Sequence, residues 1–231
     1  MGDEATREPQ YQRCLDLRAE EGLTRLGLMT NQAWHDDPKH LLFTLSRYKF
    51  VAKMLDGCRQ VLEVGCADAF GTRIVQSAVG EVTAVDFDPV FVRDAQARMD
   101  PHWRFDVRAH DMLSGPVAGT FDGTYAMDVL EHIPIEAEDT FMSNICASLE
   151  QHGTLILGTP SLESQTYASA ASKAGHVNCK RGPELRALGR RFFHNVFQFS
   201  MNDEVVHTGY APMAHYLLIL CCGKRTDRPG A

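Results

Sequence analysis

The segment "VLEVGCADAFGT", which spans Val61–Thr72, decides the fold because it joins a strand-like apolar run to the start of a helix. A loop of this kind that cradles a nucleotide pyrophosphate usually carries the pattern Gly-x-Gly-x-x-Gly. Here Gly65 is followed by Ala67 and Ala69, and the next glycine is Gly71. Alanine is small enough for close approach of a ligand, but it disfavours the positive φ angles that glycine adopts readily. The loop is therefore a weak candidate for a pyrophosphate, which needs several backbone N–H groups aimed at it.

Short apolar runs alternate with helical patterns from about residue 60 onward. Strands are expected at Gln60–Gly65, Val82–Asp86, Trp103–Ala109, Phe121–Met127 and Thr154–Gly158. Helices are expected at Thr72–Ala78, Pro89–Met99 and Ile135–Glu150. This order predicts an α/β fold with a parallel sheet covered by helices on both faces. Ligands of such sheets bind beyond the carboxyl ends of the strands, where the strand order reverses.

Two flanking regions complete one expected domain over residues 1–231. Residues 1–58 have mostly helical patterns, and Leu41–Leu55 carries a broad apolar face that leads into the first strand. Residues 59–161 form the alternating core, and residues 162–231 begin with a long polar stretch. The remaining expected elements are a helix near Pro183–Arg190 and strands at Asn195–Ser200 and His215–Cys222.

The composition weighs against several classes of protein. The 231 residues include 23 Lys and Arg against 30 Asp and Glu, a net charge of −7, whereas nucleic-acid binding surfaces are usually basic. The seven cysteines show no metal-binding spacing, which favours reduced thiols in the cytoplasm. The acidic, polar N-terminus does not resemble a signal peptide, and no apolar run approaches the length of a transmembrane helix.

Acidic side chains recur at the expected strand ends. Glu63 ends the first strand, and Asp86 ends the second, 21 residues after Gly65. Asp111 and Asp128 follow the third and fourth strands. A carboxylate at the second strand end is placed to accept hydrogen bonds from ribose hydroxyls. Such a rim suits a cationic ligand that carries ribose and adenine, and it would repel the phosphates of a dinucleotide.

Five segments in order resemble the class I S-adenosylmethionine-dependent methyltransferases: "VLEVGCADAFGT", "VTAVDFDP", "HDML", "FDGTYAMDVLEHIP" and "GTLILGTPS". The resemblance covers residues 60–161. Within the family, the chain is similar to the methyltransferases of quinone biosynthesis and of polysaccharide pathways. The family's loop typically reads E/D-x-G-x-G-x-G, so Glu63 and Gly65 match it while Ala67 and Ala69 depart. The resemblance implies a Rossmann-like fold with a mostly parallel seven-stranded sheet, helices on both faces and an N-terminal helical lid.

The resemblance also implies the roles of individual residues toward S-adenosylmethionine. The ribose hydroxyls would meet Asp86, and the methionyl group would lie near Asp128. Arg47 or Tyr48, from the lid, would meet the cofactor carboxylate. The full set of implied cofactor-binding residues is Arg47, Tyr48, Glu63, Gly65, Ala67, Asp86, Phe87, Asp111, Met112 and Asp128.

A histidine after the fourth strand is a candidate general base. Methyl transfer from a sulfonium is an in-line displacement, so the protein must mainly align the acceptor and exclude water. A hydroxyl acceptor benefits from a base, and His132 lies on the rim where the methyl group should sit. Glu131 and a downstream His176 are its candidate partners. Alternatively, Glu131 and His132 simply brace the helix that follows.

Polar and aromatic residues outside the core are candidate substrate contacts. Most of them lie in the long stretch after the fifth strand or in "SMNDEVVHTGY", which also fits an exposed turn between two strands. The expected contacts are Trp34, Tyr167, Asn178, Lys180, Asn202, Glu204 and His207.

The leading hypothesis from the sequence is O-methylation of a small molecule, such as a sugar, a nucleotide-sugar or a secondary metabolite. The alternatives are N-methylation of a small molecule, metal-dependent RNA 2′-O-methylation, and a non-catalytic regulatory protein that binds S-adenosylmethionine. Asp128, Glu131, His132 and His176 nearly match the E-x-x-E-H…H metal-binding arrangement of small-RNA 3′-end methyltransferases, but we expect no metal. We expect a small-molecule acceptor and neither a nucleic-acid nor a membrane partner. The sequence leaves open whether the protein forms a homodimer.

Overall fold

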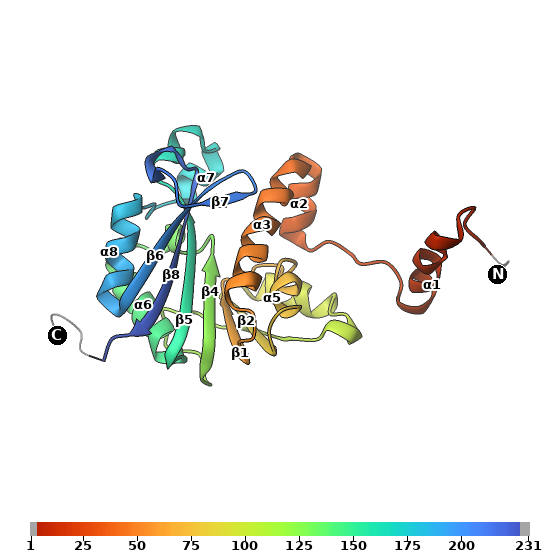
Figure 1. Cartoon of the computed structure of the whole chain (residues 1–231), viewed down its shortest axis with the longest axis horizontal. Helices are drawn as coiled ribbons and strands as arrows, with labels where there is room; N and C mark the ends of the chain where they lie inside the picture. Colours follow the sequence, from red (N-terminus) through yellow and green to blue (C-terminus); the bar gives the residue numbers. More distant parts are fainter. Residues whose placement is uncertain (1–3, 227–231) are drawn as a thin grey trace.

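The computed structural model describes residues 4–226, which fold around one eight-stranded sheet (Figure 1). Its strands lie in the order β3-β2-β1-β4-β5-β8-β6-β7. Their bounds are β1 Gln60–Val64, β2 Glu81–Asp86, β3 Asp106–Ala109, β4 Phe121–Met127, β5 Leu149–Pro160, β6 Phe193–Asn202, β7 Val205–His207 and β8 Tyr216–Lys224. The α/β prediction is confirmed.

The sheet is mostly parallel, as predicted, with an antiparallel part at one side, but the predicted count of seven strands is wrong. Strands β1 to β5 pair in parallel, whereas β8 runs antiparallel to both β5 and β6. The eighth strand is β7, which pairs with β6 across a tight turn. This strand has only three residues, and the residues on both sides of it are polar, so its sequence resembles a turn. The predicted third strand also begins later, because Pro101–Trp103 forms a short 3₁₀ helix.

The helices form layers on the two faces of the sheet (Figure 1). Side chains of α3, α4 and α5 pack against one face, and side chains of α6 and α8 pack against the other. The helices are α1 Gln12–Glu21, α2 Leu28–Asp36, α3 Pro38–Met54, α4 Thr72–Gln76, α5 Pro89–Ala97, α6 Glu138–Ser148, α7 Ala170–Gly175 and α8 Gly182–Phe192. None of them is long and apolar enough to cross a membrane within the described residues.

Burial on both faces explains why the central strands are mostly apolar rather than alternating. On β1, Val61 packs with Leu55, the residue directly after α3, and its neighbour Leu62 packs with Phe141 of α6. All four side chains are almost completely buried. Parallel strands covered by helices on both sides have this continuous apolar pattern. Strand β1 lies between β2 and β4, so the strand order reverses there and the ligand site is expected at its carboxyl end.

The N-terminal region divides into two parts. Helices α2 and α3 pack side by side, and α3 packs on the sheet. Helix α1 has no buried residue, and Figure 1 shows it set apart from the sheet at the end of an extended segment. Only α2 and α3 therefore lie where a lid over the cofactor should be.

The segment after α7 is anchored by a buried ion pair. The ammonium group of Lys180 lies 2.6 Å from the Glu138 carboxylate of α6, and both side chains are almost buried. The amide of Asn178 donates to the same carboxylate at 3.0 Å. The sequence predicted Asn178 and Lys180 as substrate contacts, but here their polar ends face the interior, so they connect this segment to α6.

We expect Lys180→Met to lower the free energy of unfolding by about 3 kcal/mol, because it leaves the buried Glu138 carboxylate without its cation. Urea denaturation measures this change. The double variant Glu138→Gln/Lys180→Met should recover most of the loss, since both charges are then removed. Lys53→Met, at an exposed lysine of α3, is the matched control. An equal effect of the two single lysine variants would contradict the buried-pair interpretation.

Candidate active site

The turn after β1 brings two strand ends into contact. Gly65 has a φ of 74°, a backbone conformation that favours glycine. A Cβ atom at this position would lie 2.3 Å from Cγ2 of Val129, which follows β4. The turn therefore needs glycine for its conformation and for its close approach to the end of β4.

The alanines that replace glycines in this loop keep positive φ angles. Ala67 has a φ of 45° and Ala69 a φ of 54°. Both values lie in the left-handed region, which L-residues with a Cβ atom occupy at a cost of about 1–2 kcal/mol. The loop thus retains the backbone path expected of glycines, and contacts from outside the loop must hold it there.

Asp86, at the end of β2, fixes one part of this loop. Its Oδ2 accepts the backbone N–H of Ala67 at 2.8 Å, and its Oδ1 accepts that of Asp88 at 2.9 Å. Each carboxylate oxygen can accept a second hydrogen bond, so Asp86 can hold the loop and still receive ribose hydroxyls.

Glu63 lies beneath the loop as a buried carboxyl group. It is 1% exposed, and the hydroxyl of Thr72, at the start of α4, donates to it at 2.5 Å. Burial raises the pKa of Glu63 from 4.5 to about 7, and the Thr72 hydrogen bond opposes this rise only in part. The side chain therefore links β1 to α4 rather than opening toward a ligand.

The next strand ends provide a partly exposed rim. The ring of Phe87 is 76% exposed directly after β2, and Asp111 is exposed after β3. Both are free to contact an adenosine group. Met112, expected to cover adenine, is only 5% exposed and packs in the core beside α6. The side chain of Met112 therefore does not face the rim.

Arg47 reaches from α3 to the end of β4. Its guanidinium group lies 2.5 Å from the carboxylate of Asp128 and 3.7 Å from the ring centroid of Tyr216. The Nε of this buried arginine has no hydrogen-bond partner among the described residues. Tyr48, the other predicted carboxylate contact, instead packs its ring against Gly71.

Three predicted catalytic residues meet beyond β4. Glu131, His132 and His176 each present a ligand atom within 4.8 Å of the other two. Glu131 is 1% exposed and accepts from the hydroxyl of Thr159 at 3.1 Å. Burial, together with the nearby charge of Asp128, raises the pKa of Glu131 from 4.5 to about 8.

The hydrogen bonds of the two histidines define their tautomers. Nδ1 of His132 lies 2.9 Å from the carbonyl oxygen of Gly175, which can only accept, so this nitrogen carries the proton in the neutral ring. Nδ1 of His176 lies 2.8 Å from the side-chain oxygen of Gln165 and is protonated for the same reason. Burial and the neighbouring His132 lower the pKa of His176, so its ring stays neutral. Both Nε2 atoms are left to accept a proton or to bind a cation.

Comparison with known proteins finds methyltransferases. A family described as "Methyltransferase domain" matches residues 61–153. A ubiquinone biosynthesis O-methyltransferase of Xanthomonas axonopodis pv. citri (strain 306) is 29% identical over 164 residues, which cover 67% of each chain. These matches support a class I S-adenosylmethionine-dependent methyltransferase.

Solved structures support the same fold. The N-methyltransferase NodS from Bradyrhizobium japonicum WM9, in complex with S-adenosyl-L-homocysteine, superposes with a TM-score of 0.61 at 19% identity, over 84% of this chain and 91% of NodS. The methyltransferase domain of bacterial CtHen1-C superposes with a TM-score of 0.65 at 14% identity, over 78% and 98%. The predicted family and its cofactor, S-adenosylmethionine, are confirmed.

The other predicted substrate contacts of the methyltransferase are not gathered at one point. Trp34 on α2 is 59% exposed, and Tyr167 is 90% exposed on a 3₁₀ turn after β5. In the β6–β7 hairpin, Nε2 of His207 donates to the side-chain oxygen of Asn202 at 2.9 Å, while Glu204 is exposed in the turn. Asn202 and His207 thus bond to each other across the hairpin, and their role toward an acceptor stays a prediction.

Sequence reasoning missed two residues that shape the methyltransferase site. Thr159 was not singled out, although its hydroxyl bonds to Glu131. Asp68 lies between the two alanines of the loop, and its carboxylate bonds to Thr30, 38 residues upstream. An acidic residue between two small loop residues was a visible signal, but its distant partner could not be read from local sequence.

We expect the cofactor-free methyltransferase to lose stability as pH rises from about 4.5 to 7, because in this range Glu63 ionises in the unfolded chain but stays protonated in the fold. The full effect is on the order of 3 kcal/mol. Chemical denaturation across this pH range measures it.

Glu63→Gln should reduce this pH-dependent loss, because glutamine keeps the buried polar group without its charge. The loss that remains is that of Glu131, whose pKa is raised in the same way. Glu136→Gln, at an exposed glutamate, should leave the pH profile as it is. If the profiles of Glu63→Gln and the unaltered protein coincide, Glu63 is ionised in the folded state.

Proposed function

We propose that this methyltransferase transfers the methyl group of S-adenosylmethionine to a hydroxyl group of a small molecule. The observation that carries the proposal is the free Nε2 of His132, fixed by the Gly175 carbonyl beyond the end of β4. A neutral imidazole with an available nitrogen is suited to accept a proton near neutral pH. An amine acceptor has less need of such a base.

The cofactor is proposed to lie across the ends of β1, β2 and β4. Asp86 would accept the ribose hydroxyls, and the exposed ring of Phe87 would contact the adenosyl group. The methionyl group would pass along the backbone of Gly65, which has no side chain of its own. The guanidinium group of Arg47, whose Nε is unpartnered, would donate to its carboxylate.

The proton path follows from the histidine geometry. As the acceptor oxygen attacks the methyl carbon, its proton would pass to Nε2 of His132. The resulting imidazolium would lie beside the Glu131 carboxyl, and its positive charge would favour the ionised form of that acid. His176, held neutral by burial and by His132, would orient the acceptor by a hydrogen bond.

The surroundings of the histidines support an acceptor with an apolar part. Ile135 and Val177 lie within three residues of His132 and His176, and they are 68% and 60% exposed. Among the acceptors expected from the sequence, a hydroxylated secondary metabolite fits this surface better than a bare sugar. The relative in ubiquinone biosynthesis is an O-methyltransferase, which supports a hydroxyl acceptor. The net charge of −7 weighs against RNA.

We expect His132→Ala to lower kcat on a hydroxyl acceptor by about 10²- to 10⁴-fold, the usual contribution of a positioned general base. Radiolabelled methyl transfer to matched panels of phenols, sugars and amines measures this and identifies the acceptor class. Calorimetry should find the affinity for S-adenosylhomocysteine unchanged.

His152→Ala is the matched control and should keep full activity. His152 is exposed near the start of β5, whereas Thr159, which contacts Glu131, lies near the other end of this strand. Turnover of a hydroxyl acceptor by His132→Ala within a few-fold of the unaltered enzyme would exclude His132 as the base. Transfer to amines alone would overturn the O-methylation proposal.

A divalent cation at Glu131, His132 and His176 is a second way to activate the same hydroxyl. Two imidazole nitrogens and a carboxylate oxygen form a donor set that first-row divalent ions accept. The residues fit such an ion, because the buried Glu131 carboxyl has no arginine or lysine paired with it in the described part of the chain. A bound cation would lower the pKa of an acceptor hydroxyl held next to it.

If the cation is required, dialysis against EDTA should abolish activity, and Mn²⁺ or Mg²⁺ should restore it. Calorimetric titration with Mn²⁺ should then show binding that Glu131→Gln removes. Full activity after EDTA treatment, together with no Mn²⁺ binding, would leave His132 as the base and exclude the metal.

A further inference from the structure

The cofactor loop is tied to the N-terminal region through Asp68. Its carboxylate accepts the backbone N–H of Thr30 at 2.7 Å and the hydroxyl of Thr30 at 3.2 Å. It also accepts the N–H of Phe70 within the loop at 3.2 Å. Asp68 is only 5% exposed, so these bonds are shielded from water. A carboxylate at this place caps the first turn of α2, where backbone N–H groups have no partner within the helix.

A second connection runs through Arg98, which follows α5. Its guanidinium group donates to the backbone carbonyl of Asp68 and, at 2.9 Å, to the carboxylate of Asp94. The same Asp94 oxygen accepts the N–H of Leu28 at 3.2 Å. The first turn of α2 is therefore held by two carboxylates, and Arg98 joins that of Asp94 to the backbone of the loop.

The start of α2 lies very close to these groups. A Cβ atom on Gly27 would lie 2.4 Å from Cγ of Asp68 and 2.5 Å from a guanidinium nitrogen of Arg98. Any larger residue at Gly27 would push α2 away from the loop.

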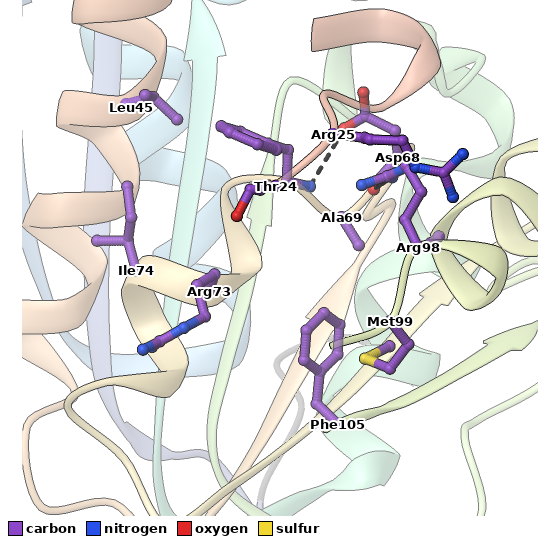
Figure 2. A pocket seen from close by; sticks show the side chains of 12 residues that line it. Thr24, Arg25, Leu45, Asp68, Ala69, Arg73, Ile74, Arg98, Met99 and Phe105 are labelled. Atoms are coloured by element: carbon purple, nitrogen blue, oxygen red, sulfur yellow. Dashed lines mark hydrogen bonds between the residues drawn. The ribbon is translucent and has the colours of Figure 1, made fainter. Parts of the chain in front are cut away.

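Behind the loop, packing is incomplete. A cavity of about 310 Å³ lies there, and Ala69 and Phe70 contribute to its wall (Figure 2). Figure 2 also shows Asp68 and Arg98 beside the segment that carries Thr24 and Arg25. A pocket of this size admits water, so the residues that line it are not packed against protein on that side. The loop therefore depends on its polar contacts more than a fully packed turn would.

We propose that Asp68 is a positioning residue that holds the cofactor loop by docking the N-terminus of α2. Ala67 and Ala69, on either side of it, have the left-handed conformations that alanine disfavours. Such conformations persist where surrounding contacts over-determine them. The contacts of Asp68 with Thr30 and Arg98 supply that restraint. Docking of α2 and binding of the cofactor are thus coupled, and the coupling acts in both directions.

The proposal rests on S-adenosylmethionine as the cofactor, but not on the acceptor or on the role of His132. Its test uses binding of S-adenosylhomocysteine by calorimetry, which needs no acceptor. Asp86→Ala in the same series should lose most of the affinity. If it does not, the placement of the cofactor is wrong, and this failure is distinct from a failure of the proposal about Asp68.

We expect Asp68→Ala to weaken S-adenosylhomocysteine binding by about tenfold or more, the scale of a lost helix cap in a strained loop. Gly27→Ala acts from the α2 side without altering the loop sequence, and it should weaken binding in the same way. Asp37→Ala is the matched control, because Asp37 caps α3 through the N–H of Lys39 and has no contact with the loop. It should lower the melting temperature but leave the affinity within twofold.

Replacing both alanines by glycine provides the decisive variant. Glycine adopts positive φ without strain, so Ala67→Gly/Asp68→Ala/Ala69→Gly should recover most of the affinity that Asp68→Ala loses. A side chain that contacted the cofactor directly would not be replaced in this way. Affinity within twofold of the unaltered protein in both Asp68→Ala and Gly27→Ala, or no recovery in the triple variant, would overturn the proposal.

Discussion

The backbone path of the turn between β1 and α4 is the constraint on which the site depends. Gly65 must approach Val129 to within contact distance, and Ala67 and Ala69 must then hold left-handed conformations. Neither alanine favours that path, so the carboxylates of Asp86 and Asp68 hold it from two sides. The cofactor site is thus assembled from three parts of the chain: the loop itself, the end of β2, and the start of α2.

Much of this arrangement could be predicted from the sequence, because it follows from local pattern. Apolar runs with intervening helical spacing predicted the five parallel strands, and acidic residues at their ends indicated where a cationic cofactor would lie. His132 and His176, 44 residues apart, were expected together because, with Asp128 and Glu131, they nearly match the metal-binding arrangement of small-RNA 3′-end methyltransferases. The structure places them with ring centroids 5.2 Å apart.

What the sequence could not show were side-chain directions and distant partners. Met112 follows β3 as predicted, but its side chain turns into the core. Lys180 lies in the polar stretch that was expected to contact the substrate, yet it pairs with Glu138, 42 residues earlier in the chain. The partner of Asp68 depends on how α2 lies over the loop. Each of these is decided by packing between elements, on which local periodicity carries no information.

A crystal structure of the protein with S-adenosylhomocysteine would test the account most directly. It should show the ribose hydroxyls within hydrogen-bond distance of Asp86, with Ala67 and Ala69 still at positive φ and Asp68 still bonded to Thr30. A ligand placed away from the ends of β1 and β2, or a loop with either alanine at negative φ, would contradict it.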